Sequence, residues 1–288
     1  GKSTFIKRFM ETQVIPNIEN IYRRERAIDE LPQSGSGKTV MTAEPKFVPE
    51  EAVEVSLGDG ATVSVRLIDS VGYMVKGAMG QFEDGQPRMV MTPWFEDEIP
   101  MAEAAEIGTR KVITEHSTIG IVVTTDGSIT DIDREDYIEP EDRVIQELKE
   151  LGKPFIVLLN SEEPTSQRAQ SISQEISKKH GVACMPINCL TLNEQDIKNI
   201  LQAVLFEFPL CELDFYLPSW VDALQMDHPI KSGIYTRIRE AASGLEHVRQ
   251  VRSAMEEIGN GEEIKDAKIT GIDLGKGIAG VELELPRQ

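Results

Sequence analysis

The first two-thirds of the chain alternates short apolar runs with longer stretches in which apolar residues recur at helical spacing. Two apolar runs, Thr118–Thr124 and Phe155–Asn160, are continuous, which is typical of parallel strands covered on both faces. Strands that alternate with helices predict βαβ units. The expected strands are Ala52–Leu57, Thr62–Asp69, Thr118–Thr124, Phe155–Asn160 and Ala183–Asn188. The expected helices are Ser3–Glu11, Met101–Glu115, Glu141–Glu150, Ser166–Lys179 and Glu194–Phe206.

One pair of strands breaks this alternation. The runs Ala52–Leu57 and Thr62–Asp69 flank Gly58-Asp59-Gly60, and an Asp-Gly pair between two strands favours a tight hairpin turn. The sequence therefore predicts an α/β fold whose mostly parallel sheet carries one antiparallel edge strand.

The pattern changes after Pro209, and we place a domain boundary near residue 212, giving domains 1–212 and 213–288. Apolar residues recur at helical spacing from Ile230 to Ile258, which predicts one long helix ended by Gly259-Asn260-Gly261. Residues 263–271 and 277–285 then favour two strands, so the second domain is expected to begin with a long helix followed by a β hairpin.

Charge narrows the functional classes. The 288 residues include 30 Lys and Arg against 49 Asp and Glu, a formal net charge of −19. Such a balance argues against a nucleic-acid partner and against direct electrostatic binding to an anionic membrane. No apolar run approaches the roughly 20 residues of a transmembrane segment. The three cysteines show no metal-ligand spacing and indicate reduced thiols in a cytoplasm.

The first residues carry candidate chemistry. Gly1-Lys2-Ser3-Thr4, followed by a helix-like run, matches the second half of a phosphate-binding loop. In that motif the glycine allows backbone N–H groups to surround phosphate, the lysine binds the β and γ phosphates, and the serine binds Mg²⁺. A chance match at a helix start is the alternative. Because the sequence starts inside the motif, we expect a fragment without the preceding strand and the first glycine of the loop.

A second motif strengthens this interpretation. The strand ending at Arg66-Leu67-Ile68-Asp69 continues into Ser70-Val71-Gly72, a D-x-x-G pattern. Asp69 at a strand end is placed to hold Mg²⁺, and the N–H of Gly72 to meet the γ-phosphate. An ordinary acidic turn is the alternative. We predict Lys2, Thr42 and Asp69 as catalytic residues and Gly1, Lys2, Ser3, Thr4 and Gly72 as phosphate-binding residues.

The segment between the two motifs offers a threonine of the switch type. Thr42 precedes the strand that leads to Asp69, where its hydroxyl would complete a Mg²⁺ shell made with Ser3 and Asp69. Thr39 competes for this role, and an ordinary loop threonine is the alternative. Gly35-Ser36-Gly37-Lys38-Thr39 also resembles a phosphate-binding loop, but Pro32 stands where its first glycine is needed and no strand precedes it.

The expected base-binding segment departs from the guanine-specific N-K-x-D pattern. Asn160 is present, Ser161 replaces the lysine, and Glu163 replaces the aspartate. We predict Asn160 and Glu163 as base-binding residues, and the departures favour ATP or loose specificity over strict GTP use. Tyr73 follows the D-x-x-G motif where many small GTPases carry a water-orienting glutamine. This predicts slow turnover, or a water held instead by the backbone, by Thr42 or by a neighbouring subunit.

His116 and an acidic run that begins at Asp126 are interpreted as structural features rather than as parts of a site. His116 stands at the end of an expected helix and is interpreted as structural rather than as a base. The acidic run Asp126, Asp131, Asp133, Glu135 and Asp136 is interpreted as a solvated loop, with a partner-facing surface as the alternative.

Together these motifs, with Gln33–Pro49 and Leu67–Val75, resemble the stage IV sporulation protein A family, spore coat morphogenetic ATPases of the GTPase-like P-loop class. The resemblance covers essentially the whole chain. It implies ATP hydrolysis with Mg²⁺, with Lys2 and Ser3 in the phosphate loop, Thr42 as sensor and Asp69 as the Walker B-like acid.

The same resemblance implies a cellular role. It implies self-assembly into a homopolymer that forms the basement layer of the spore coat, on the mother-cell face of the forespore outer membrane. A small amphipathic membrane-bound protein would recruit the polymer, and other coat proteins would dock on it. Self-association of so acidic a chain should be sensitive to salt. A GTP-dependent assembly factor and a structural coat protein with a vestigial site are the alternatives.

Overall fold

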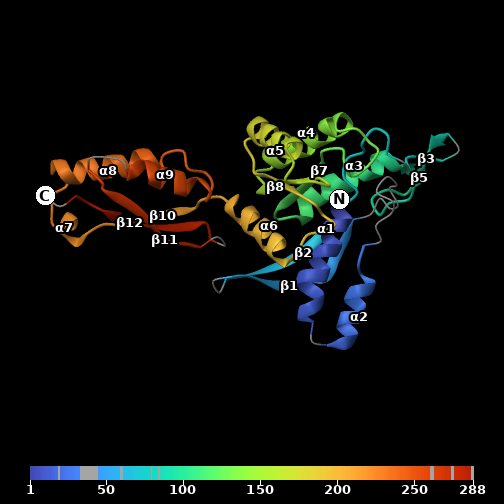
Figure 1. Ribbon diagram of the computed structural model, residues 1–288, viewed down its shortest axis with the longest axis horizontal. Coiled ribbons are helices and arrows are strands. Elements are labelled where there is room, and N and C mark those ends of the chain that lie inside the picture. Colours follow the sequence, from blue (N-terminus) through green and yellow to red (C-terminus); the bar gives the residue numbers. More distant parts are fainter. Residues whose placement is uncertain are drawn as a thin grey trace. The chain divides into compact units, whose positions relative to one another are not determined.

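The computed structural model describes residues 1–18, 20–32, 45–58, 61–78, 80–83, 85–259, 263–273 and 276–286 (Figure 1). The chain folds as two compact units, Gly1–Ala203 and Val204–Gln288. Thr39, Thr42 and the glycine-rich loop 35–39 lie outside the described residues. The domain boundary near residue 212, which was expected from composition, stays a prediction.

A three-stranded parallel sheet forms the centre of the N-terminal unit. Its strands β7 (Gly120–Thr125), β8 (Phe155–Asn160) and β9 (Cys184–Ile187) lie in the order β7-β8-β9. Every residue of β8 is buried, which matches its unbroken apolar sequence. The predicted α/β fold with parallel strands is confirmed.

Helices cover both faces of this sheet (Figure 1). On one face lie α4 (Glu135–Glu150) and α5 (Gln167–His180). On the other face lie α1 (Lys2–Phe9) and α6 (Glu194–Phe206). The core between the sheet and α4 and α5 includes Val122, Ile145, Leu148, Val157, Leu159, Ala169 and Ile176. Because the faces are covered, polar groups of this unit gather where the strands end.

The hairpin is present, but it stands apart from the parallel sheet. Strands β1 (Lys46–Gly58) and β2 (Ala61–Asp69) pair antiparallel, and among the described residues they form a two-stranded sheet of their own. This differs from the expectation of an antiparallel edge on one larger sheet. The ladder between β1 and β2 has a register shift between Val48 and Val53, and β2 ends at Asp69.

Shorter elements complete the N-terminal unit. They are η1 (Met10–Val14), η2 (Ile15–Asn17), α2 (Ile21–Asp29), β3 (Phe82–Glu83), β4 (Gln86–Pro87), β5 (Met89–Val90), β6 (Ile99–Pro100), α3 (Met101–Lys111) and η3 (Val112–His116). The α2 helix was not predicted. Asn20 begins it by accepting hydrogen bonds from the backbone N–H groups of Tyr22 and Arg23, at 3.0 and 3.2 Å.

The C-terminal unit is a mixed sheet with helices on one face. Strands β10 (Glu212–Tyr216), β12 (Ile278–Glu284) and β11 (Asp266–Asp273) lie in the order β10-β12-β11. β10 runs parallel to β12, and β11 runs antiparallel to it. Helices α7 (Ser219–Asp222), α8 (Pro229–Ala242) and α9 (Gln250–Ile258) supply the core against alternate residues of β12.

Two sequence expectations fail in this unit. The predicted long helix is two helices, because Ser243 leaves the helical conformation and Gly244 has φ of 85°. The strand β10 was not predicted at all. Its start lies against Gly277, whose φ is 69°, and the N–H of Cys211 donates to the Gly277 carbonyl at 2.8 Å. A Cβ at position 277 would clash with the carbonyl oxygen of Pro209.

Within the part of the chain that the structure describes, no helix has both the length and the apolar character needed to cross a membrane.

Candidate nucleotide-binding site

The two predicted phosphate motifs meet in space. Helix α1 begins at Lys2, directly after Gly1, and strand β2 ends at Asp69. The hydroxyl of Ser3 donates a hydrogen bond to Oδ2 of Asp69 at 2.8 Å, although the two residues are 66 positions apart. Thr4 follows in the first turn of α1, whose N-terminus carries a partial positive charge. The fold thus joins a hydroxyl, a carboxylate and a helix N-terminus.

Lys2 completes this group with a positive charge. Burial lowers the pKa of the Lys2 ammonium, and the neighbouring Asp69 carboxylate opposes that shift. Nζ of Lys2 lies close to Gly72, since a Cβ placed on Gly72 would be 3.2 Å from it. An anion bound beside this desolvated ammonium would favour its charged form, which is the behaviour that a phosphate site requires.

Asn160 lies between Gly1, on the phosphate side of the site, and Cys189, in the loop after β9. Its side chain is only 4% exposed, and its Oδ1 accepts a hydrogen bond from the N–H of Cys189 at 2.9 Å. A Cβ on Gly1 would lie 3.9 Å from Nδ2 of Asn160 and 3.1 Å from Cγ1 of Val123. The structure therefore places the predicted base-binding Asn160 between Gly1 and the loop after β9, where it ties three segments together.

The carboxylate Asp126 lies between the ends of β7 and β8 and corrects one interpretation. It is 3% exposed instead of solvated, and it accepts hydrogen bonds from the hydroxyls of Ser128 and Ser161, each at 2.6 Å. Burial raises its pKa, but these hydrogen bonds outweigh burial and the pKa is lowered overall. Ser161, which replaces the lysine of the guanine motif, is thus engaged with Asp126.

Glu163, the other predicted base-binding residue, lies at the surface. Its side chain is exposed, and its backbone N–H donates to Oγ of Ser161 at 3.1 Å. A ligand that reaches it would therefore meet a solvated carboxylate, which weakens the selectivity that a single hydrogen bond can provide.

Two residues that the sequence reasoning missed contact the D-x-x-G loop. The N–H of Gly72 donates to Oγ1 of Thr109 on α3 at 3.0 Å, and the phenol of Tyr73 donates to Oε2 of Glu147 on α4. Thr109 lies on the buried face of α3 with Met101 and Ala105. A small polar residue on the apolar face of an expected helix is the one sequence signal that could have pointed to it.

His116 has the structural setting that the sequence suggested. It lies at the end of η3, and its ring meets that of Phe47 edge to face, with 5.9 Å between centroids. No described contact brings it to Lys2, Ser3 or Asp69.

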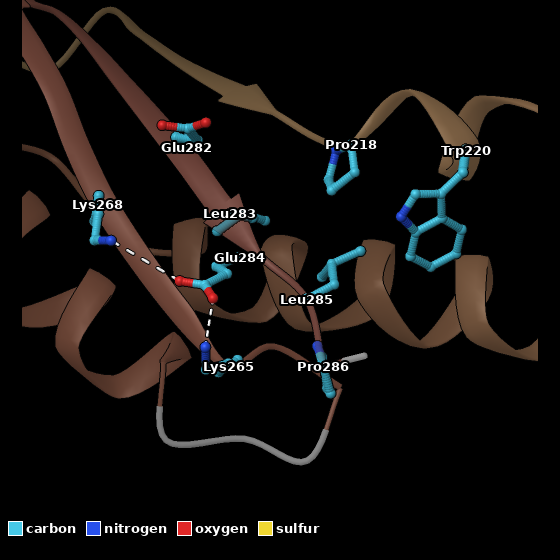
Figure 2. A pocket seen from close by; sticks show the side chains of 9 residues that line it. All are labelled: Pro218, Trp220, Lys265, Lys268, Glu282, Leu283, Glu284, Leu285 and Pro286. Atoms are coloured by element: carbon cyan, nitrogen blue, oxygen red, sulfur yellow. Dashed lines mark hydrogen bonds and ion pairs between the residues drawn. The ribbon is translucent and has the colours of Figure 1, made fainter. Parts of the chain in front are cut away.

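A pocket lies next to this site. It has a volume of about 220 Å³, and Lys2, Gly72 and Thr109 line it together with apolar residues of β7, η3 and α4. A separate pocket of about 1110 Å³ belongs to the C-terminal unit (Figure 2). There Trp220 and Pro218 face the end of β12, and Lys268 pairs with Glu284 at 3.9 Å. This second pocket holds none of the predicted nucleotide residues.

The donor set suits magnesium. Mg²⁺ prefers oxygen ligands and binds proteins through one or two oxygens together with substrate phosphates. The Ser3 hydroxyl and the Asp69 carboxylate supply such oxygens within 2.8 Å of each other, and Lys2 stands on the phosphate side. The described residues therefore fit a Mg²⁺–phosphate group, while Thr42 lies outside them.

Comparison with known proteins identifies the class of protein to which the chain belongs. A family model described as the ATPase domain of stage IV sporulation protein A matches residues 1–209. The N-terminal unit is therefore an ATPase domain with an α/β fold. The model of the middle domain of the same protein matches residues 210–288. The chain belongs to the stage IV sporulation protein A family, as the sequence motifs indicated.

Individual relatives support the assignment. Stage IV sporulation protein A of Clostridioides difficile (strain 630) is 46% identical over 284 residues. The proteins of the same name from Bacillus subtilis (strain 168) and Bacillus anthracis are each 48% identical over 286 residues. Each alignment covers 99% of this chain but only 58% of the relative. No solved structure gives a significant match.

The assignment to the family does not assign individual residues. The roles predicted for Gly1, Lys2, Ser3, Thr4, Asp69, Gly72, Asn160 and Glu163 stay predictions. What the geometry adds is that the first six of these, though drawn from two distant motifs, come from adjoining ends of α1 and β2.

Proposed function

We propose that this chain hydrolyses ATP to ADP and phosphate with Mg²⁺, slowly, and that the reaction controls its assembly into a polymer. The observation that carries the proposal is the meeting of Ser3 and Asp69 beside the ammonium of Lys2. The match of residues 1–209 to an ATPase domain supports the choice of nucleotide.

The residues would divide the work as follows. Lys2 and the N-terminus of α1 would hold the β and γ phosphates and offset the charge that develops on the transferred group. Ser3 and Asp69 would hold Mg²⁺, which supplies charge neutralisation to the phosphates when bound. Gly72 would offer its N–H to the γ-phosphate. Water would attack phosphorus, and the bond to the β-phosphate oxygen would break, leaving ADP and phosphate.

Slow turnover follows from the environment of Tyr73. Its phenol is committed to Glu147, so it is not free to orient the attacking water. Burial, followed by the hydrogen bond to Glu147, raises the pKa of Tyr73. The phenol therefore stays protonated and does not act as a base at neutral pH.

The cellular role belongs to the same proposal. The family assignment supports a polymer that forms the basement layer of the spore coat on the forespore outer membrane, facing the mother-cell cytoplasm. A small amphipathic membrane-bound protein would recruit it, and other coat proteins would bind to it. The net charge of −19 is one reason why a recruiting partner would be needed at an anionic membrane.

The test uses two lysines of one helix. Lys2→Ala should lose phosphate release and nucleotide-dependent sedimentation. Lys7→Ala should keep both, because the Lys7 side chain is 45% exposed and pairs with Glu11 at 3.9 Å. Both variants would be assayed with ATP, with GTP and without nucleotide, at low and high salt.

Each alternative has its own result. Full turnover by Lys2→Ala would contradict the ATPase proposal. Faster hydrolysis of GTP than of ATP would favour the GTP-dependent factor. Equal sedimentation without nucleotide would leave a structural protein with a vestigial site.

A further inference from the structure

The amide of Gly72 is already occupied in this structure. Gly72 has φ of 82°, and its N–H donates to Oγ1 of Thr109 at 3.0 Å. Thr109 is 4% exposed and lies 37 positions further along the chain, on α3. A backbone N–H is a single donor, so it serves one strong acceptor at a time.

That amide lies on the phosphate side of the site. A Cβ on Gly72 would be 3.2 Å from Nζ of Lys2, so the loop and the ammonium are neighbours. A γ-phosphate oxygen bound by Lys2 and the hydroxyl of Thr109 would therefore compete for the same N–H. A diphosphate has no γ oxygen and leaves the existing bond undisturbed.

The next residue is fixed by both neighbouring helices. Tyr73 donates to Glu147 of α4, and the guanidinium of Arg143 lies 4.2 Å from the centre of the Tyr73 ring. Arg143 also forms two hydrogen bonds of 2.9 Å with Glu106 of α3. With Tyr73 anchored, the smallest change that frees the amide is a rotation of the Gly72 peptide, which glycine tolerates.

We propose that Thr109 is a specificity-determining residue that holds the Gly72 amide until a nucleoside triphosphate displaces it. Thr109 thereby lowers the affinity for the triphosphate relative to the diphosphate. The inference rests on the proposed nucleotide site and adds a residue and a ligand preference to it. Tyr73, Arg143 and Glu106 limit the change to one peptide group.

The central experiment compares nucleotide affinities of threonine variants. Thr109→Val keeps the side-chain shape and removes the acceptor, Thr109→Ser keeps the acceptor, and Thr114→Val removes an exposed hydroxyl that bonds the Arg110 carbonyl at 2.9 Å. Calorimetry with the purified protein would give the dissociation constants of ADP and of the non-hydrolysable analogue AMPPNP. Thr109→Val should bind AMPPNP about threefold to tenfold more tightly, with ADP unchanged. The other two variants should match the wild type.

A second measurement needs no variant. With ¹⁵N-labelled glycine, the Gly72 amide resonance of the wild-type protein should shift strongly when AMPPNP is added and little when ADP is added. This comparison decides the question even when Thr109→Val fails to fold.

The outcomes separate the two proposals. If the wild type binds both nucleotides and Thr109→Val leaves their affinity ratio unchanged, the role of Thr109 is overturned and the nucleotide site stands. Weaker AMPPNP binding by Thr109→Val would also overturn it, since Thr109 would then support the triphosphate. If the wild type binds neither nucleotide, the proposed function fails and the inference fails with it.

Discussion

The two units bury their sheets differently, and their charged side chains are placed differently as a result. β8 is buried along its whole length, whereas β12 alternates buried residues such as Val281 with exposed ones such as Glu282. A strand covered on both faces has no position for a solvated charge, so polar groups of the N-terminal unit collect at strand ends. The C-terminal sheet instead carries its charges on an open face.

Ion pairs show the same contrast. Arg134 and Glu141 in the N-terminal unit form two hydrogen bonds of 2.7 and 2.8 Å, with side chains 12% and 3% exposed. Lys265 and Glu284 pair on the open face of the other sheet, 61% and 47% exposed. The first pair is part of the packed interior, and the second is screened by water. The burial of an ion pair, more than the distance between its charges, therefore decides how much the pair contributes to stability.

The largest expected effect follows from breaking the buried pair. Glu141→Gln leaves the charge of Arg134 poorly compensated in the interior, so unfolding of the N-terminal unit should cost about 3 kcal/mol less than in the wild type. Urea unfolding would be followed through Trp94 in a Trp220→Phe background.

Two controls make this result specific. Glu284→Gln, followed through Trp220 in a Trp94→Phe background, should leave the C-terminal unit unchanged. Replacing both buried partners, as in Arg134→Met with Glu141→Leu, should recover much of the loss. An equal effect of Glu141→Gln and Glu284→Gln would remove the distinction between the units.

A smaller effect is expected at Asp126. Asp126→Asn weakens hydrogen bonds from Ser128 and Ser161 and should lower the free energy of unfolding by about 1–3 kcal/mol at pH 7. The pKa of Asp126 lies below its usual value of 3.8, so the stabilisation is complete above that value and is lost as pH falls through the folded-state pKa. The gap between wild type and variant should therefore close below about pH 4.

The matched control is an aspartate on the open face. Asp214→Asn, on β10, should change stability by no more than about 0.5 kcal/mol. A gap for Asp126→Asn that widened on acidification would contradict the assigned hydrogen bonds.

The smallest expected difference between the two units is in the reactivity of their cysteine thiols. Burial raises the pKa of Cys184 and of Cys189 to about 11, so both thiols of the N-terminal unit stay protonated near neutral pH. Cys189 is buried and Cys184 is half-buried. Cys211 in the C-terminal unit is exposed. Titration with a disulfide reagent at pH 7.5 should label Cys211 alone, and all three thiols in denaturant. Labelling of Cys184 as fast as that of Cys211 would contradict the raised pKa of its thiol.

The sequence predicted the elements whose local pattern agrees with their burial. The run Phe155–Asn160 is apolar throughout because both faces are covered, and this made β8 and its neighbours recognisable. The long helix was wrong for a physical reason: Ala241 and Leu245 before and after the break pack against one core, so the spacing continues across Gly244. Only a tertiary contact, such as that between Gly277 and Cys211, marks β10.

The candidate site divides in the same way. Lys2 and Asp69 belong to motifs with their own local spacing, so the sequence brought them forward. Thr109 and Glu147 act through the placement of α3 and α4 against the D-x-x-G loop, which no spacing encodes. Asp126 was misread because an aspartate between polar residues gives no sign that serine hydroxyls will surround it.

Gly277 lies against the chain at residues 209–211, where the two family-matched regions meet in sequence. The backbone around Pro209 and Cys211 crosses directly over the glycine, leaving no volume for even a methyl group. Crowding alone therefore excludes a side chain at position 277, whether or not a substitution would also remove an interaction. A larger residue at position 277 would therefore require the start of β10 to move away from β12.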